Sequence, residues 1–207
     1  MEKYWNSIWN APDIVKYTEY VKSYIAWEPS FLDFFAERKV QSICDAGCGF
    51  GAYSVMLAKK GYYIDGFDIS KNAVALTLRM LQTYDCAYGE YKVCDINQID
   101  FADNRFDAVV AHAVIDHVPQ SQAIAALDEL CRITNKNGLL YITFDPLDEE
   151  DINKPHVLLD DGSRQYNDGL LFRHYTDTEI HEFLSGKEIV YSSTNKRGER
   201  ELILIIR

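Results

Sequence analysis

The stretch Ile43-Cys44-Asp45-Ala46-Gly47-Cys48-Gly49-Phe50-Gly51 decides how the rest of this chain is interpreted. It begins as an apolar strand ending in an acid, continues with three glycines at alternate positions, and leads into an apolar helical pattern from Ala52. Glycines at this spacing let the backbone turn tightly and approach a ligand closely. The first turn of the following helix offers unpaired N–H groups to a polar ligand. The stretch therefore predicts a nucleotide or nucleoside site.

Strand and helix patterns alternate after this loop. The predicted strands are 40–46, 62–67, 90–94, 106–111 and 139–144, and the predicted helices are 52–60, 71–84 and one from Pro119 to Asn137-Gly138. The last part of the chain, 188–193 and 202–206, reads as a β-hairpin. This order predicts an α/β fold with a doubly wound, mostly parallel sheet of about seven strands, in which the last strand is antiparallel.

The length of 207 residues suits a single domain, which we expect over 1–207. Residues 1–38 are helical and aromatic in pattern and are expected to form an N-terminal helical cap. Residues 146–175 contain the turn sequences Asp160-Asp161-Gly162 and Asn167-Asp168-Gly169, so we expect an inserted hairpin lid there. The pattern Thr176-x-x-Glu179 is a capping box that predicts the start of a helix.

The composition narrows the class of function. A formal net charge of −11 disfavours binding to nucleic acid or to an anionic membrane. No apolar run approaches about 18 residues, so no membrane-spanning helix is expected, and the first residues lack a signal-peptide pattern. The five cysteines are odd in number and form no Cys-x-x-Cys pair, which indicates reduced thiols in a cytoplasmic protein.

Two interpretations of the glycine loop compete. The spacing Gly47-x-Gly49-x-x-Ala52, with Asp68 about 20 residues further on, fits a dinucleotide fingerprint. Three features count against a dehydrogenase: the acid at Asp45, the third glycine of the loop, and a further acid, Asp95, after the third strand. Acids at the ends of three consecutive strands suit a ligand with a cationic head, a ribose diol and an adenine amino group better than a pyrophosphate.

At these positions the sequence resembles the class I S-adenosylmethionine-dependent methyltransferases. The resemblance runs over residues 40–145 and includes the terminal hairpin. It is carried by Asp45-x-Gly47-x-Gly49-x-Gly51, Gly66-Phe67-Asp68-Ile69-Ser70, Phe106-Asp107-Ala108-Val109-Val110 and Ala113-Val114-Ile115-Asp116-His117-Val118. It implies a Rossmann-like fold and S-adenosyl-L-methionine as the cofactor.

For the methionine part of the cofactor, the resemblance implies that Gly47, Gly49 and the neighbouring backbone, including Cys48, hold it. Asp45 would orient the ammonium group, directly or through water, and the backbone at Ala111 would face the same group. A nucleophilic role for Cys48 is the less favoured alternative, because a small side chain between glycines also serves simply to fill the loop.

For the adenosine part, the resemblance implies that Asp68 accepts both ribose hydroxyls and that Ile69 packs against the adenine. Asp95 would accept from the adenine amino group, with Ile96 on the ring. Each residue has a structural alternative: Asp68 as a helix cap, Asp95 as a surface turn residue, and the two isoleucines as ordinary core.

His112, Asp116 and His117 follow the fourth predicted strand, at the sheet edge where open α/β folds bind ligands. His117 is the candidate general base because its ordinary pKa lies near neutrality, and Asp116 is the candidate that orients it. The alternatives are a histidine that packs or caps the next helix and an acid that solvates the turn. A metal site from these three residues is a weak hypothesis, so no metal is expected.

The walls of the acceptor pocket are expected to come from outside the main sheet. The N-terminal cap offers aromatic faces to a sulfonium or a cationic acceptor, from Tyr4, Trp5, Trp9, Tyr17 and Tyr20. Arg173 and His174 of the lid are placed at the pocket mouth, where Arg173 suits a carboxylate. The alternatives are aromatic packing against the sheet and an ordinary surface strand.

The sequence thus predicts methyl transfer to a small-molecule acceptor, and it leaves the acceptor and the oligomeric state open. One alternative is a non-catalytic regulatory protein that binds S-adenosylmethionine or S-adenosylhomocysteine. A third and weaker possibility is an NAD(P)-dependent oxidoreductase.

Overall fold

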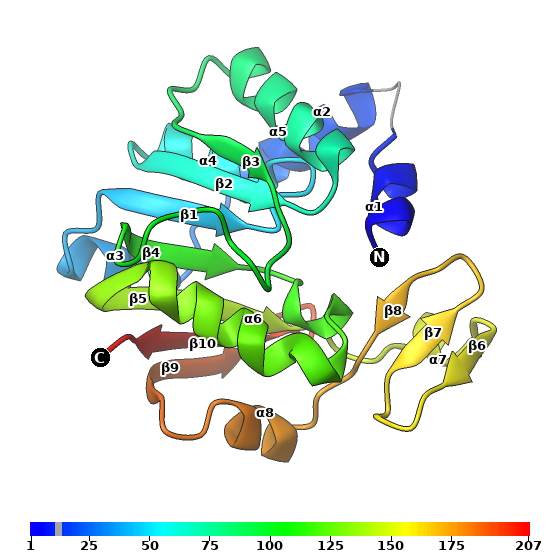
Figure 1. The fold of residues 1–207 in the computed structure, drawn as a ribbon. Helices are drawn as coiled ribbons and strands as arrows, with labels where there is room; N and C mark the ends of the chain where they lie inside the picture. Colours follow the sequence, from blue (N-terminus) through cyan, green and yellow to red (C-terminus); the bar gives the residue numbers. More distant parts are fainter. Residues whose placement is uncertain (11–13) are drawn as a thin grey trace.

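The computed structural model describes residues 1–10 and 14–207 (Figure 1); residues 11–13, which fall within the expected N-terminal cap, lie outside the described part. Its main sheet has the strand order β3-β2-β1-β4-β5-β10-β9. The strands are β1 (Ser42–Ala46), β2 (Tyr63–Asp68), β3 (Tyr91–Val93), β4 (Phe106–Ala111), β5 (Thr134–Phe144), β9 (Glu188–Thr194) and β10 (Arg200–Ile205). β10 is antiparallel to both of its neighbours, and the pairs among β1 to β5 are parallel. The predicted sheet is confirmed.

One predicted boundary is wrong. The strand expected at 139–144 begins at Thr134, so helix α6 (Gln120–Ile133) ends earlier than the Asn137-Gly138 pair suggested. That pair does not stop a helix but hydrogen-bonds to the end of the chain: the Asn137 amide donates to the Ile206 carbonyl (2.7 Å), and the Ile206 amide donates to the Gly138 carbonyl (3.0 Å). The Asn137-Gly138 pair, which is typical of a local turn, thus contacts a segment that is distant in the sequence.

Helices cover both faces of the sheet, as alternation along the strands requires. In β4, Ala108 and Val110 belong to the core on one face, while Val109 and Ala111 belong to the core on the other. The first face is covered by α3 (Phe31–Glu37) and α4 (Ala52–Lys59), with α2 (Ile14–Ile25) and α5 (Lys71–Thr83) packed beside α4. The second face is covered by α6 and α8 (Asp177–Phe183). The sheet is therefore packed on both faces, with a separate hydrophobic cluster on each.

The carboxyl ends of β1, β2 and β4 point to the side of the molecule where α1 (Glu2–Ile8) and a small second sheet lie (Figure 1). The small sheet consists of β6 (His156–Leu158), β7 (Arg164–Tyr166) and β8 (Leu171–Phe172), and it follows the short helix α7 (Glu149–Asn153). Its two connections contain the two predicted turn sequences. The capping box of Thr176 and Glu179 opens α8 as predicted.

Within the part of the chain that is described, every helix is too short or too polar to cross a membrane.

Candidate active site

The glycine loop after β1 has a backbone that only glycine adopts readily. Gly47, Gly49 and Gly51 have φ values of 71°, 52° and 83°. A Cβ at Gly47 would lie 2.6 Å from the Cγ2 of Val114. The amides of Gly47 and Cys48 donate to the Phe67 carbonyl (2.9 and 3.0 Å). These amides are therefore used inside the protein, and this part of the loop contributes shape rather than free donors.

A pocket of about 630 Å³, counting space open to solvent, lies between this loop, the ends of β2 and β3, and helix α1. We call it the glycine-loop pocket. Its lining includes Trp5, Trp9, Gly47, Gly49, Asp68, Ile69, Asp95, Ile96, Val114 and His117. The structure thus brings together six of the nine residues expected to bind the cofactor, together with the candidate base and Trp9.

Asp68, at the end of β2, is 7% exposed and accepts two backbone hydrogen bonds. Its Oδ2 accepts from the Gly49 amide (3.0 Å) and its Oδ1 from the Ser70 amide (2.8 Å). Burial raises the pKa of this carboxyl, and the two backbone hydrogen bonds partly offset that effect. The cap of α5 is the Ser70 hydroxyl, which accepts from the Ala73 amide (3.2 Å). The helix-cap alternative for Asp68 is therefore not supported.

Asp95, which follows β3, has one engaged and one free carboxylate oxygen. Its Oδ1 accepts from both the backbone and side-chain nitrogens of Asn97 (2.9 Å each). Among residues 1–10 and 14–207, no side chain or backbone group is hydrogen-bonded to its Oδ2. Ile69 and Ile96 line the same pocket and supply apolar surface beside this carboxylate. Asp95 thus builds a turn and also contributes to the pocket.

Asp45 is 3% exposed and lies on the other side of the glycine loop, in a second pocket. The Ser54 hydroxyl donates to its Oδ2, and Ser54 in turn accepts from the Tyr91 hydroxyl (2.8 Å). Burial raises the pKa of Asp45 to about 6, with the Ser54 hydrogen bond acting in the opposite direction. The Asp45 carboxyl is thus mostly ionised at neutral pH.

The second pocket, which we call the bridging pocket, measures about 700 Å³. It shares Trp5, Trp9, Gly47, Gly49, Ala113 and His117 with the glycine-loop pocket. It adds Tyr24, Asp45, Cys48, Phe50, Ala52, Tyr53 and His112. The N-terminus of α4 therefore faces the bridging pocket. A helix N-terminus favours a negatively charged group.

Two expectations about this region change. Ala111 is fully buried and lines neither pocket; its neighbours His112 and Ala113 do. Cys48 lines the bridging pocket, but burial raises the pKa of its thiol well above the usual value. The thiol is therefore neutral, and the structure gives no support to a nucleophilic Cys48.

His117 is positioned by backbone and aromatic contacts. Its Nδ1 lies 2.9 Å from the Leu171 carbonyl, and its ring lies 5.1 Å from that of Trp5. Donation from Nδ1 leaves Nε2 as the basic nitrogen of the neutral ring. Burial lowers the pKa of His117, and the hydrogen bond to Leu171 partly offsets this. His117 lines both pockets, so its placement is compatible with a base at their junction.

Asp116 does not orient His117, and that expectation is wrong. Its side chain is fully buried, lines none of the pockets described here, and accepts from the Asp145 amide (2.8 Å) through Oδ2. Burial raises the pKa of Asp116 well above its usual value, and the nearby Asp145 carboxylate adds to the effect. Successive side chains of a short 3₁₀ turn point in different directions, so a sequence neighbour of His117 faces the interior.

The N-terminal cap contributes two of its five expected aromatic residues to the pockets. Trp5 and Trp9 line both pockets and stack on each other, with ring centroids 6.3 Å apart. Tyr17 lines neither pocket and packs on Trp9 and Phe50, with ring centroids 6.1 and 5.3 Å apart. Which aromatic residues face the pockets was not readable from the sequence, because the docking of α1 depends on distant contacts.

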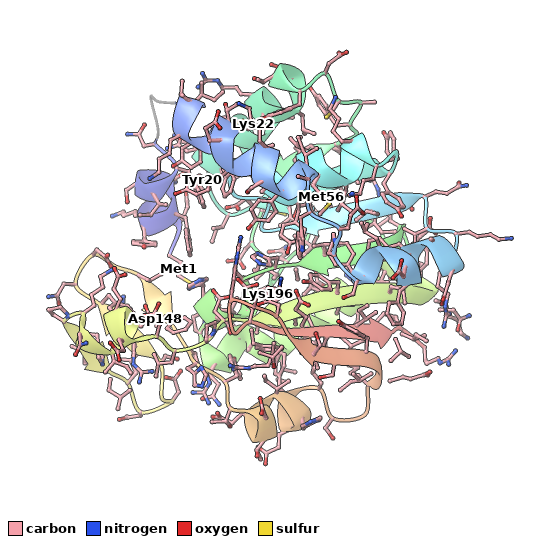
Figure 2. The ribbon with its side chains drawn as sticks, turned by 180° about the vertical axis from the view of Figure 1, so that it is seen from behind. Met1, Tyr20, Lys22, Met56, Asp148 and Lys196 are labelled. Carbon is pink, nitrogen blue, oxygen red and sulfur yellow. The ribbon has the colours of Figure 1, made fainter. Side chains whose placement is uncertain are left out.

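Helix α1 is held at the pocket by hydrogen bonds to the start of α5. The Ser70 hydroxyl donates to the Asn6 side-chain oxygen (2.8 Å), and the Asn72 side-chain amide donates to the Asn6 carbonyl (2.7 Å). Figure 2 shows Met1 below α1 and next to the small sheet. These contacts hold α1 over the glycine-loop pocket, although α1 is far from the glycine loop in the sequence.

Arg173 and His174 were expected at the pocket mouth, and the structure places both elsewhere. Arg173 is 6% exposed, and its Nη2 donates to Glu179 Oε1 (2.6 Å). Neither residue lines the glycine-loop or bridging pocket. The Arg173 guanidinium, which follows β8, therefore pairs with Glu179 of α8 and lines neither pocket.

His112, expected in the substrate pocket, lines the bridging pocket. Its ring packs against Tyr53 with centroids 4.6 Å apart, and its Nε2 lies 3.6 Å from Glu199 Oε2. Tyr53 and Glu199 were missed, since one belongs to an apolar helical pattern and the other to a hairpin more than 80 positions away in the sequence. In the residues that the structure describes, no group of three His, Cys, Asp or Glu side chains is arranged to hold a metal.

The comparisons agree with this geometry. The model of a methyltransferase domain family matches residues 44–142. The magnesium-protoporphyrin O-methyltransferase of a Synechocystis strain is 30% identical over 98 residues, which are 47% of this chain and 42% of that protein. The chain thus spans less than half the length of this curated relative.

Two solved structures share the fold. A protein from Pyrococcus horikoshii superposes with a TM-score of 0.74 at 15% identity, covering 96% of this chain and 93% of that one. A Synechocystis magnesium protoporphyrin IX methyltransferase with bound S-adenosylmethionine superposes with a TM-score of 0.64 at 20% identity, covering 99% and 90% of the two chains. At these identities the likeness concerns the fold.

Proposed function

Because the chain belongs to the class I S-adenosylmethionine-dependent methyltransferases, we propose that it transfers a methyl group from this cofactor to a small-molecule acceptor. The observation that carries the proposal is the convergence of Asp68, Asp95 and the glycine loop on one pocket. A relative named for O-methylation of magnesium-protoporphyrin is consistent with a small acceptor. The net charge of −11 argues against a nucleic-acid acceptor.

The residues present fit the cofactor. Asp68 has two carboxylate oxygens that each retain acceptor capacity for a ribose hydroxyl. Asp95 Oδ2 suits an amino group, and Ile69 and Ile96 suit an apolar ring. On the other side of the loop, Asp45 suits an ammonium group, while the start of α4 suits a carboxylate.

When bound, S-adenosylmethionine supplies an activated methyl group on a sulfonium. The protein then has to position the acceptor and exclude water. Trp5 and Trp9 lie over both pockets and provide apolar, water-excluding surface. Their π faces also suit a neighbouring positive charge.

His117 is the residue we propose as proton acceptor when the methyl acceptor must lose a proton. Its Nδ1 is engaged with the Leu171 carbonyl, so the proton would be taken at Nε2. Its pKa is lowered by burial, so the ring is neutral and able to accept a proton at neutral pH. We also propose a cytoplasmic setting, supported by five free cysteines.

Calorimetric titration with S-adenosylhomocysteine tests the cofactor site, and transfer of an isotopically labelled methyl group to a metabolite extract tests the activity. Binding together with transfer is the expected result. Binding without transfer to any acceptor would favour the non-catalytic regulatory alternative. Absence of binding by the folded protein would contradict the proposal, and binding of a nicotinamide dinucleotide in its place would favour the oxidoreductase.

A further inference from the structure

A third pocket, of about 1170 Å³ with its open space, lies beside the bridging pocket. We call it the hairpin pocket because the turn between β9 and β10 forms one of its sides; the end of α2 and the segment before α3 form another. Tyr24, Tyr53 and His112 line both the hairpin pocket and the bridging pocket. The hairpin pocket is therefore adjacent to the proposed site of methyl transfer and shares part of its lining.

Two glutamates of the hairpin form the acidic floor of this pocket. The side chain of Glu199 is 12% exposed, and Glu201 is 6% exposed. Asn195 Nδ2 donates to both, at 2.6 Å to Glu199 Oε2 and 3.0 Å to Glu201 Oε1. One amide group thus holds the two carboxylates side by side, although two like charges at short range repel.

Glu201 presents a free acceptor to the pocket. Its Oε1 also accepts from the Tyr141 hydroxyl (3.1 Å). Its Oε2 is hydrogen-bonded to no group in residues 1–10 and 14–207, and it is not among the fully enclosed atoms without a partner. An oxygen of a buried carboxylate that lines a pocket and has no protein partner is a strong site for a charged donor.

The Glu199 carboxylate remains ionised in this setting. Burial by itself raises the pKa of Glu199, but the nearby His112 ring, the hydrogen bond from Asn195 and the charge of Arg197 outweigh it and hold the pKa below its usual value. The floor of the pocket therefore carries negative charge at neutral pH.

The walls of the hairpin pocket are aromatic: they include Tyr24, Trp27, Tyr53 and Tyr191. The Tyr24 ring lies 5.5 Å from that of Tyr53 and 6.0 Å from that of Trp27. Aromatic faces above a carboxylate attract an organic cation through both the ring quadrupole and the ion pair.

The basic residues of this pocket lie at its exposed mouth. Arg197 has a side chain that is 64% exposed, with Nη1 lying 3.3 Å from the Tyr24 hydroxyl and 4.0 Å from Glu199 Oε1. Lys196 is exposed at the hairpin turn, beneath α2 in the view of Figure 2. The third acid of the lining, Glu28, is paired with Lys60 (2.6 Å). The charge deep in the pocket is thus negative.

We infer that the hairpin pocket holds the protonated amine of the methyl acceptor, so that the acceptor class is small organic amines with an apolar or aromatic body. This inference rests on the proposed function, since it assigns the acceptor of that same site. Glu201 and Glu199 bind the ammonium group, and the four aromatic side chains contact the remainder. His112, which packs on Tyr53 and lies near Glu199, lines both this subsite and the bridging pocket.

The test is ligand-observed NMR on the protein saturated with S-adenosylhomocysteine, with matched pairs of probes. Each pair is an amine and its neutral isostere: tyramine with 4-(2-hydroxyethyl)phenol, phenethylamine with phenethyl alcohol, and benzylamine with benzyl alcohol. We expect the amines to bind at least about tenfold more tightly than the alcohols. Glu201→Gln should remove the difference, while Glu188→Gln, a change at an exposed glutamate on the same hairpin, should keep it.

A preference for the alcohols, equal binding within the pairs, or no binding of any amine would overturn the inference. If Glu201→Gln fails to fold, the inference is tested by Glu199→Gln and by comparing each amine with its alcohol on the wild-type protein. The titration with S-adenosylhomocysteine is measured separately, so failure of the proposed function is recognised by absent cofactor binding. Failure of the amine assignment is recognised by intact cofactor binding without amine preference.

Discussion

The Asp68 carboxylate is hydrogen-bonded to the Gly49 amide, Oδ2 to N at 3.0 Å, across 19 positions of the sequence. The acid that ends β2 therefore holds the glycine loop after β1 in its shape and also lines the pocket that the loop forms. One side chain thus combines the support of the loop with the proposed contact to the cofactor. Substitutions of Asp68 are expected to act through both.

We predict that Asp68→Ala raises the dissociation constant for S-adenosylhomocysteine by about two orders of magnitude, because two charge-assisted hydrogen bonds are lost. Asp68→Asn should weaken binding less, since one oxygen remains. Isothermal titration calorimetry measures both values. Asp128→Ala, at an exposed position of α6, is the matched control and should bind like the wild type. Unchanged affinity in Asp68→Ala would remove Asp68 from the site.

Gly47→Ala should lower the free energy of unfolding by about 2–4 kcal/mol, from the cost of a positive φ and from overpacking. The added Cβ would lie 2.6 Å from Val114 at a φ of 71°. Gly61→Ala also requires a positive φ, but its Cβ would meet nothing within 4 Å, so only about 1–2 kcal/mol should be lost. Urea unfolding curves give both values. Equal losses in the two variants would argue against the close approach at Val114.

Asp45 should make stability depend on pH. Its folded-state pKa, about 6, lies above its value in the unfolded chain, so its contribution is fully present below the unfolded pKa and is lost as pH rises through about 6. Relative to Asp45→Asn, the wild type should lose about 3 kcal/mol between about pH 4 and pH 7. Unfolding of both proteins across this range measures the difference. A difference that stays constant with pH would contradict the raised pKa.

His117→Gln is expected to reduce kcat by about 10²-fold for an acceptor that loses a proton, with affinity for S-adenosylhomocysteine retained. Because burial lowers the pKa of His117, the wild-type rate should fall with acid only below about pH 6.5. The pH profile of kcat/KM measures this, and the variant should lack that limb. His181→Ala, on exposed α8 surface, serves as control. A variant with the wild-type profile would show that His117 only packs.

Arg173→Met should destabilise the fold without affecting ligand binding. The guanidinium is buried and paired with Glu179, which is partly exposed and also accepts from Thr176, so its removal is expected to cost about 1–2 kcal/mol through the lost charge-assisted hydrogen bond. Thermal or urea unfolding measures the loss, and calorimetry measures the affinity for S-adenosylhomocysteine. A weakened affinity with unchanged stability would restore the earlier hypothesis that Arg173 meets a ligand.

The structural features that could be predicted from the sequence are those that depend on residues close together in the chain. The glycine loop, the acids that end β2 and β3, and the capping box of Thr176 and Glu179 were all readable, because each depends on residues within a few positions. Asp68 and Asp95 line one pocket because the carboxyl ends of parallel strands meet at one edge of the sheet. The methyltransferase fold follows from the same pattern of alternating strands and helices.

The orientation of side chains outside these motifs was not readable. Asp116 and His117 are adjacent in sequence, yet one is sealed in the core and the other lines two pockets. The sequence placed Arg173 at the pocket mouth or on a surface strand, whereas in the structure it is buried and paired with Glu179 of α8. These positions depend on which distant element covers them, and no local pattern encodes that.

The amino-acid sequence alone therefore specified the parallel sheet, the glycine loop and the acids at the strand ends, because backbone sterics and hydrophobic periodicity act over short stretches. Only the tertiary structure decided which side chains line the pockets. Helix α1 brings Trp5 to the glycine-loop pocket, and the β9–β10 hairpin brings Glu199 to His112 across 87 positions. Such contacts arise from the packing of whole elements against one core, and their free energy is shared among many residues.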